Sequence, residues 1–368
     1  MKTTVLLGLL IGTALTATTS AFAQEATSIG KLSYLGEFVL PTGLKIAGTE
    51  FGGISGMDYD AASDTYYAIS DDRSELAPAR FYTLKLAIDG KGVHSVDILG
   101  SHELMSAAGT PFAKKDVDPE SIRVDSANGK LYWSSEGDLR GKPSITEANL
   151  DGSFVAAFDV PPAYMPNADG THGVRSNLAF EALTISADGK SLLAGTENAL
   201  AQDGDKSTLD AGSMSRFIRF DLATHKPVAE YVYETAKIFT ASTAPKPYND
   251  EGMSEFLTFD QNTLITLERS FAIGVGNQVN LFVASLDGAT DVNGADTIKG
   301  MDIKTVAKQK LLTIDEGTFG LDIDNVEDLT WGPMVDGKRT LIIASDNNFN
   351  PDGEFTQFVA FSLDPAAK

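Results

Sequence analysis

The stretch Pro119-Glu120-Ser121-Ile122, followed by Trp133-Ser134-Ser135-Glu136-Gly137, contains the pattern that decides the fold. An acidic start leads into an apolar run, Asn128-Gly129 separates it from a second apolar run, and an acidic residue follows that run. Asn-Gly between two alternating apolar runs is a strong signal for an antiparallel hairpin. The stretch therefore predicts two paired strands that carry carboxylates at the end away from their turn.

This pattern occurs five times in the sequence. Its starts fall at positions 55, 120, 181, 255 and 327, so the spacing between copies is 61 to 74 residues. Such a spacing is too long for a solenoid repeat and is typical of a four-stranded propeller blade. The other four copies are Gly53-Ile54-Ser55-Gly56-Met57 with Ala68-Ile69-Ser70-Asp71-Asp72, Phe180-Glu181-Ala182-Leu183 with Ala194-Gly195-Thr196-Glu197-Asn198, Ser254-Glu255-Phe256-Leu257 with Leu267-Glu268-Arg269, and Val326-Glu327-Asp328-Leu329 with Ala344-Ser345-Asp346-Asn347-Asn348.

Further apolar stretches after these copies supply the outer strands. The second, third and fourth copies are followed by two stretches each, at 144–150 and 154–160, 216–222 and 228–233, and 279–286 and 309–314. The fifth copy is followed by one stretch only, 356–363, and the missing strand is available at 31–40. Pairing these two segments would close the ring and cover an open sheet edge. We therefore predict an all-β fold, a single β-propeller over residues 24–368 with five four-stranded blades. A count of six, with one blade formed within the loops, is the alternative.

The first 23 residues have the features of a secretory signal peptide. Lys2 precedes an apolar run over 5–15, and Ala21-Phe22-Ala23 forms a small-residue cleavage site. This pattern predicts cleavage after Ala23 and a periplasmic or secreted bacterial protein. The apolar run is too short to span a membrane, which takes ~20 apolar residues.

The composition limits the classes of partner. The formal net charge is −22 over 368 residues, and there is no cysteine. An acidic chain lacks the basic patches that nucleic acid and anionic lipid surfaces require. We therefore expect no nucleic-acid partner and no membrane insertion, and we expect a monomer whose stability comes from packing and bound ions instead of disulfides.

Carboxylates stand at both strand ends in four of the five copies. If the hairpins are symmetric about their turns, the acids lie directly opposite each other at one mouth of the central channel. The predicted pairs are Glu120 with Glu136, Glu181 with Glu197, Glu255 with Glu268, and Glu327 with Asp346, whereas Ser55 faces Asp71 in the first copy.

Such a ring of acids favours a bound cation. Like charges directly opposite on a sheet are destabilising, and they raise pKa values unless a cation neutralises them. Calcium prefers oxygen ligands, whereas zinc is disfavoured because the chain has no cysteine and its four histidines are scattered. The candidate ligands are Glu120, Glu136, Glu181, Glu255, Glu327, Asp71 and Asp346. Alternatively, the acids pair with Arg73, Arg123, Arg175 and Arg269.

The stretch Thr171-His172-Gly173-Val174-Arg175-Ser176-Asn177 lies immediately before Glu181. It would bring His172, Arg175 and Asn177 to the same mouth, where they could hold an anionic substrate. The alternative is a loop whose polar side chains only cap strand ends.

Several of these stretches together resemble the phytase-like family described as having esterase-like activity of phytase. The resemblance spans nearly all of the chain after residue 23. It is carried by Gly53-Ile54-Ser55-Gly56, Ser70-Asp71-Asp72-Arg73, Ala79-Arg80-Phe81-Tyr82, Asp118-Pro119-Glu120-Ser121-Ile122, Arg175-Ser176-Asn177, Phe180-Glu181-Ala182-Leu183, Leu267-Glu268-Arg269 and Ser345-Asp346-Asn347-Asn348-Phe349.

The resemblance implies a hydrolase that acts on esters, and its leading candidate substrates are phosphate esters. In the similar calcium-dependent propeller phytases, calcium bridges protein carboxylates and substrate phosphate, although those propellers have six blades. By this analogy Glu181, Glu197 and His172 are candidate catalytic residues, and Arg73, Arg175, Asn177 and Arg269 are candidate ligands of a small anionic ester. Two alternatives stay open: a non-catalytic propeller with structural calcium that binds a ligand or protein partner, and a calcium-dependent lactonase or carboxylesterase.

Overall fold

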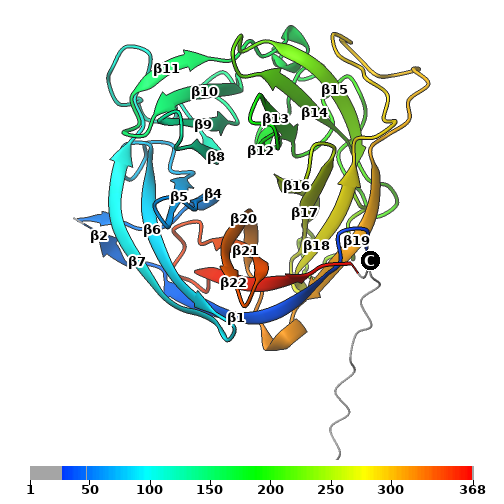
Figure 1. Cartoon of the computed structure of the whole chain (residues 1–368). Helices are drawn as coiled ribbons and strands as arrows, with labels where there is room; N and C mark the ends of the chain where they lie inside the picture. The colour runs from blue at the N-terminus through cyan, green and yellow to red at the C-terminus, as the bar shows by residue number, and fades with distance from the viewer. Residues whose placement is uncertain (1–26, 47, 367–368) are drawn as a thin grey trace, which may run out of the picture.

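The computed structural model describes residues 27–46 and 48–366, so the predicted signal peptide lies outside the described residues. Five four-stranded sheets stand around a common axis (Figure 1). The helices within the described part are two three-residue 3₁₀ helices, η1 (Pro162–Tyr164) and η2 (Thr318–Gly320). In those same ranges no helix has the length and apolarity needed to cross a membrane. The predicted all-β, five-bladed propeller is confirmed.

Each blade is an antiparallel sheet whose strands follow one another along the chain. Blade 1 consists of β4 (Ile54–Asp60), β5 (Thr65–Ser70), β6 (Arg80–Asp89) and β7 (Gly92–Glu103). Blade 2 consists of β8 (Pro119–Asp125), β9 (Lys130–Ser135), β10 (Ser144–Asn149) and β11 (Phe154–Ala157). Blade 3 consists of β12 (Phe180–Ile185), β13 (Ser191–Thr196), β14 (Met214–Asp221) and β15 (Pro227–Glu234). Blade 4 consists of β16 (Asn249–Thr258), β17 (Thr263–Ala272), β18 (Gly276–Ser285) and β19 (Ala307–Asp315).

Blade 5 joins the two ends of the propeller. It combines β20 (Asn325–Val335), β21 (Lys338–Asp346) and β22 (Phe355–Asp364) with the N-terminal strand β1 (Lys31–Pro41). β1 pairs with β22 along its whole length, from Lys31 opposite Asp364 to Pro41 opposite Phe355, as the blue and red strands of Figure 1 show. The predicted closure of the ring is confirmed. A short hairpin of β2 (Lys45–Ile46) and β3 (Thr49–Glu50) leads from β1 into blade 1.

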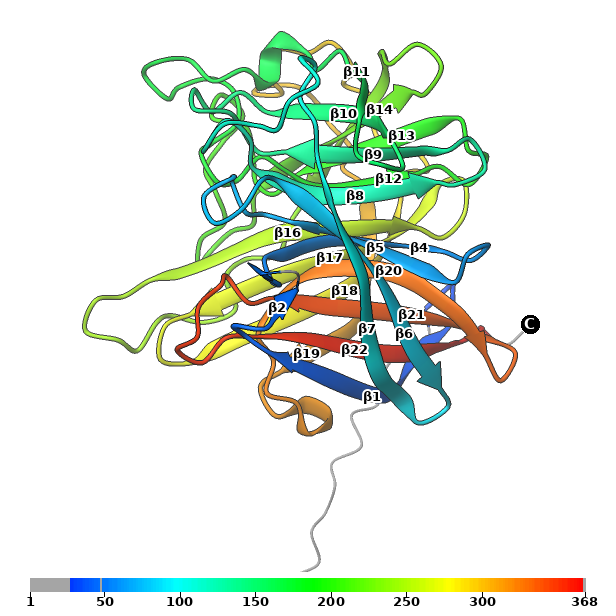
Figure 2. The same cartoon turned by 90° about the vertical axis from the view of Figure 1, so that its left-hand side faces the viewer.

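The core consists of apolar layers between neighbouring blades. Alternate residues of each strand face the next blade, as expected for sheets that are covered on both faces. One layer between blades 4 and 5 contains Leu281, Ile343, Val359 and Phe361, all fully buried. Figure 2 shows the strands of successive blades crossing at an angle, which is the arrangement that twisted sheets adopt when they pack face to face.

The inner strands β4, β8, β12, β16 and β20 contact one another in a ring around the axis. A buried ion pair joins two of these strands, in which Arg123 Nη2 of blade 2 lies 2.9 Å from Glu255 Oε2 of blade 4. Both side chains are almost completely inaccessible to solvent. We call this pair the axial plug.

Hydrogen bonds connect the axial plug to every blade. Arg123 donates to the carbonyl oxygens of Met57 in blade 1 and of Leu329 in blade 5, at 2.7 and 3.4 Å. Glu255 accepts from the Leu183 amide of blade 3 at 3.1 Å. Hydrogen bonds to the remaining positions lower the cost of burying charged groups, and these backbone partners provide them for both side chains except at Arg123 Nε.

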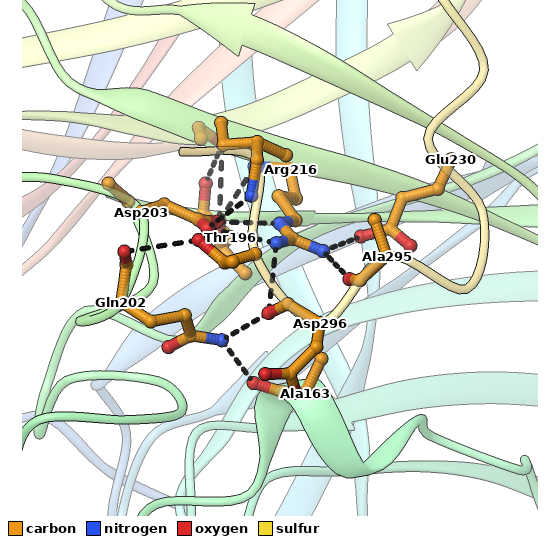
Figure 3. A network of polar contacts seen from close by, with 12 residues as sticks. Ala163, Thr196, Gln202, Asp203, Arg216, Glu230, Ala295 and Asp296 are labelled. Carbon is orange, nitrogen blue, oxygen red and sulfur yellow. Dashed lines mark hydrogen bonds and ion pairs between the residues drawn. The ribbon is translucent and has the colours of Figure 1, made fainter. Parts of the chain in front are cut away.

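A second buried network fixes the long connection between β18 and β19, residues 286–306, against blade 3 (Figure 3). Arg216 of β14 is fully buried and pairs with Asp203 at 2.7 Å and with Glu230 at 2.9 Å. Its guanidinium also donates to the carbonyl oxygen of Ala295 at 2.9 Å, as the dashed lines in Figure 3 show. Asp203 in turn accepts from the Ile298 amide at 2.9 Å. One guanidinium thus holds the 286–306 connection against two neighbouring segments of blade 3.

Replacement of Arg216 should destabilise the protein strongly. Arg216→Met leaves Asp203 and Glu230 buried without a counter-charge, so the free energy of unfolding should fall by about 3–5 kcal/mol in urea denaturation. The matched control is Arg219→Met, in the same strand, whose guanidinium stacks on Tyr231 at 5.8 Å from the ring centroid. That variant should lose no more than about 1 kcal/mol. Equal effects of the two substitutions would contradict a special role for the Arg216 network.

Candidate metal centre

The inner strand of every blade begins with the same irregularity in its pairing. Between the first and second strands the register shifts by one residue, which is the signature of a β-bulge. The extra residue is Ser55, Glu181, Ser254 or Glu327 in blades 1, 3, 4 and 5, and in blade 2 the bulge takes in Glu120 and Ser121. A bulge turns the side chain of the extra residue out of the regular alternation, here at one mouth of the channel.

Because of the bulge, the predicted pairs of directly opposed acids are wrong. Glu136 pairs with Asp118 instead of Glu120, and Glu197 pairs with Ala179 instead of Glu181. Likewise Glu268 faces Met253, and Asp346 faces Asn325. The inner-strand partner lies two positions earlier than predicted. The bulge accounts for one position. The hairpin turn accounts for the other in blade 2, where Val124 pairs with Leu131, and a second bulge between Gly332 and Met334 accounts for it in blade 5.

Acids from blades 2 and 3 nevertheless converge at this mouth. Asp118, Glu120 and Glu136 each place a carboxylate oxygen within 4.8 Å of the other two, and so do Glu136, Glu181 and Glu197. Glu136 belongs to both groups, so the five side chains form one continuous cluster, which we call the carboxylate cluster. All five side chains are at least nine-tenths buried.

Burial and mutual repulsion raise the pKa values of the carboxylate cluster. Burial raises the pKa of Glu136 to about 7 and that of Asp118 to about 6. The pKa values of Glu120, Glu181 and Glu197 lie well above their usual range, first because of burial and then because of neighbouring carboxylates. Without a cation, several of these groups therefore keep a proton at neutral pH.

The donor chemistry of the carboxylate cluster fits a hard cation. Its members offer only carboxylate oxygens, which calcium and magnesium prefer, and no histidine or cysteine belongs to it. A cation would neutralise the repulsion that raises the pKa values. The cluster could thus bind a metal ion, and the residues for it are Asp118, Glu120, Glu136, Glu181 and Glu197.

Arg269 brings positive charge to the same mouth. It pairs with Gly252 in blade 4, the position at which the other blades carry Asp71, Glu136, Glu197 or Asp346. Its guanidinium lies 3.7 Å from Asp250 and 3.7 Å from Glu327. Burial, Glu327 and Asp250 are the main influences on Arg269, and its pKa is raised, so it stays charged.

A small cavity of about 90 Å³ adjoins the carboxylate cluster. Acids and cations both line it, among them Glu181, Glu197, Glu251, Arg269 and Lys206. Asn177, which has a left-handed backbone conformation with φ of 56°, lies at its edge together with Glu327. Arg269 and Lys206 can bind an anionic group here, but the carboxylates of the lining mean that such a group would need a cation beside it.

Asp346 is buried and Asp71 is half-buried at the mouth, and both lie outside the carboxylate cluster. Burial, followed by the charges of Glu327 and Asp118, raises the pKa of Asp71 to about 8. The pKa of Asp346 is raised well above its usual range by burial and by Asp71. These two acids therefore hold protons at neutral pH in the metal-free protein and lie beside the cluster without joining it.

Four other predicted site residues have different surroundings. Glu255 forms the axial plug with Arg123, so its carboxylate is already neutralised. The ring of His172 contacts Asp296 at 2.9 Å and the Met165 carbonyl, and it does not line the cavity. Arg175 donates to the carbonyl oxygens of Ala199 and Gly204. Arg73 lies 3.3 Å from Asp118, so it reaches the cluster as a counter-charge.

Several residues of the mouth did not emerge from the repeat pattern. Asp118 immediately precedes Pro119 and Glu120, and its position opposite Glu136 depends on the bulge. Glu251 precedes the fourth copy of the pattern, which starts at Ser254. Lys206 comes from the connection between β13 and β14, whose path the strand pattern does not determine.

The solved structures named below are similar to this chain but share little sequence with it. Curated proteins yield no match. Among solved structures, an endo-arabinase from Bacteroides thetaiotaomicron is similar at 13% identity and a TM-score of 0.47, covering 86% of this chain and 96% of that one. A bifunctional GH43-CE protein from Bacteroides eggerthii has 12% identity and a TM-score of 0.44, covering 84% of this chain and 33% of that one.

The match to a protein family is extensive. The family model named phytase-like, described as esterase-like activity of phytase, matches residues 49–349. This range begins just before blade 1, takes in all five inner strands, and includes every member of the carboxylate cluster. The resemblance inferred from the sequence is confirmed, and the chain belongs to the phytase-like family.

Proposed function

We propose that the protein is a calcium-dependent hydrolase of small anionic esters, with phosphate esters as its substrates. One observation supports this most: the carboxylate cluster adjoins a cavity that also contains Arg269 and Lys206. A cation-binding group beside two cationic side chains is the arrangement that phosphate oxygens require. Membership of the phytase-like family favours the same chemistry.

The five acids of the carboxylate cluster would hold the calcium. When bound, calcium would supply positive charge to the ester oxygens and lower the pKa of a water molecule. Calcium takes 6–8 oxygen ligands, so the five side chains leave room for substrate and water.

The remaining steps belong to side chains of the cavity. Arg269 and Lys206 bind the anionic oxygens, and Asn177 orients them. Glu181 or Glu197 accepts a proton from the attacking water, since both line the cavity. Burial and the neighbouring Glu268 raise the pKa of Glu251 well above its usual range, so Glu251 can hold a proton and donate it to the leaving oxygen.

A purely structural calcium is the second candidate. The carboxylate cluster joins strands of blades 2 and 3 and is almost fully buried, so a cation there would tie two blades together. In that case the propeller would bind a ligand or a partner without turnover.

The proposal includes the setting in which the protein acts. The signal-like segment at residues 1–23 supports export to the periplasm or the exterior. The acidic charge supports a small-molecule substrate over nucleic acid, and we propose that the protein acts as a monomer.

Calcium should stabilise the folded protein through the carboxylate cluster. Saturating calcium should raise the melting temperature by several degrees, because a ligand at 100 times its Kd adds about 2.7 kcal/mol. Glu181→Gln should abolish most of this rise in differential scanning calorimetry. The control is Glu147→Gln. Glu147 is a buried acid of blade 2, and it contacts His225 in the turn between β14 and β15 of blade 3. An unchanged calcium response in Glu181→Gln would contradict the assignment.

Turnover separates the candidate functions. Purified protein is given phytate, p-nitrophenyl phosphate, p-nitrophenyl acetate and a lactone, with calcium or with a chelator. We expect calcium-dependent release of phosphate, reduced at least about 100-fold in Arg269→Met because a group that stabilises transferring charge is lost. Stabilisation by calcium without turnover of any substrate would favour the structural role, and turnover of only the acetate or the lactone would indicate a carboxylesterase or lactonase.

The free energy of unfolding should change with pH in opposite directions with and without calcium. Raised pKa values mean that the metal-free folded state binds more protons than the unfolded state between about pH 4.5 and 8, so its stability should fall as pH rises. Calcium requires deprotonated carboxylates, so its affinity should rise over the same interval. Urea denaturation at pH 5, 6, 7 and 8 with calcium or chelator measures both slopes, and parallel slopes would contradict the prediction.

A further inference from the structure

A second and larger cavity lies at the opposite mouth of the channel. It has a volume of about 580 Å³, within the range of small-molecule sites. The turns after β8 and β12 contribute Asn128 and Gly189 to it, whereas the carboxylate cluster lies at the starts of the inner strands. Arg123 of the axial plug also lines it. The two mouths thus lie at opposite ends of the inner strands.

One wall of this cavity is apolar and held in place. Leu257, Ile185, Phe259 and Trp331 contribute to it. The indole nitrogen of Trp331 donates to the Thr258 carbonyl oxygen at 3.1 Å, and the Phe259 ring lies 6.3 Å away between centroids. An aromatic pair fixed in this way offers a preformed surface to the apolar body of a ligand.

Arg339 adds an unpaired positive charge to the same cavity. Its guanidinium carbon lies 3.5 Å from the Trp331 ring centroid and 5.7 Å from that of Phe259. Across residues 27–46 and 48–366, no hydrogen bond or ion pair of the Arg339 side chain is found. Stacking holds the guanidinium plane while leaving its N–H groups free to bind an anion in a bidentate manner.

The acids of the lining, in contrast, already have partners. Asp125 accepts from the Asn128 amide at 2.6 Å, and Asp188 accepts from the Ser186 hydroxyl at 2.7 Å. Asp58 accepts from the Val124 amide at 2.8 Å. Among the charged side chains that line this cavity, Arg339 is therefore the one for which the described residues provide neither a hydrogen bond nor an ion pair.

We propose that this second mouth is a binding site for an organic carboxylate with an apolar body. The carboxylate pairs with Arg339, and the body packs against Phe259 and Leu257. Both parts of the recognition surface are preformed: Phe259 and Leu257 provide the apolar part, and the guanidinium of Arg339 provides the cation. The proposal does not depend on calcium or on hydrolysis at the other mouth.

Benzoate is a suitable probe, and isothermal titration calorimetry measures its binding to the full-length protein. We expect one saturable site. Benzyl alcohol, which lacks the charge, and acetate, which lacks the apolar body, should each bind at least about tenfold more weakly, a loss of about 1.4 kcal/mol. Trp331 should report the same binding by fluorescence, because the other tryptophan, Trp133, is 1% exposed in blade 2.

Substitutions locate the site. Arg339→Met and Arg339→Gln should each weaken benzoate at least about tenfold, whereas Arg219→Met, also a stacked arginine, should bind it as the parent protein does. Binding should persist in chelator and in Glu181→Gln. Parent-like affinity in both Arg339 variants would overturn the proposal, as would binding that is lost in Glu181→Gln. The Arg339 variants should keep the phosphate-ester turnover of the parent protein. A turnover assay on them therefore tests the proposed hydrolysis at the other mouth separately.

Discussion

The ion pair between Arg123 and Glu255 is the interaction on which the arrangement of the blades depends. Five inner strands converge on one axis, where their backbone carbonyl and amide groups would otherwise face an unfilled space. Arg123 and Glu255 satisfy groups from all five blades, including Met57, Leu183 and Leu329. Such a pair is tolerated in a buried interior because the two charges neutralise each other and backbone groups hydrogen-bond to both. It also divides the channel into two mouths with separate chemistry.

The second constraint is the bulge that begins each inner strand. A regular strand would send successive side chains to alternate faces, so neighbouring acids would face different blades. The bulge removes one residue from this alternation and directs Glu120 and Glu181 toward Glu136. Burial in this position, followed by the charges of Asp118 and Glu327, raises the pKa of Glu136 to about 7. The fold thus concentrates negative charge at a mouth where an incoming cation would stabilise the protein most.

The sequence predicts the blades well and the pairing inside them less well. Alternation of apolar residues located the outer strands and the closing strand β1, because burial on both faces requires it. Register depends on turn geometry and on bulges, which alternation does not reveal, and this is why Glu197 faces Ala179. In the fourth copy, Arg269 stands where other blades carry an acid, so Glu255 and Glu268 were assigned to the wrong layer. Lys206 could not be placed because its loop has no regular period.

Closure of the ring by β1 has a consequence for how the chain reaches this fold. Ser33 and Asp364, which are bonded through their side chains, lie 331 residues apart in the sequence. Blade 5 cannot be completed before the last strand has left the ribosome, so the chain cannot close while it is being made. Contacts of such high sequence separation form slowly, and an incomplete blade exposes an edge that can pair with other chains. A late-closing ring therefore makes the folding of this chain dependent on protection from aggregation.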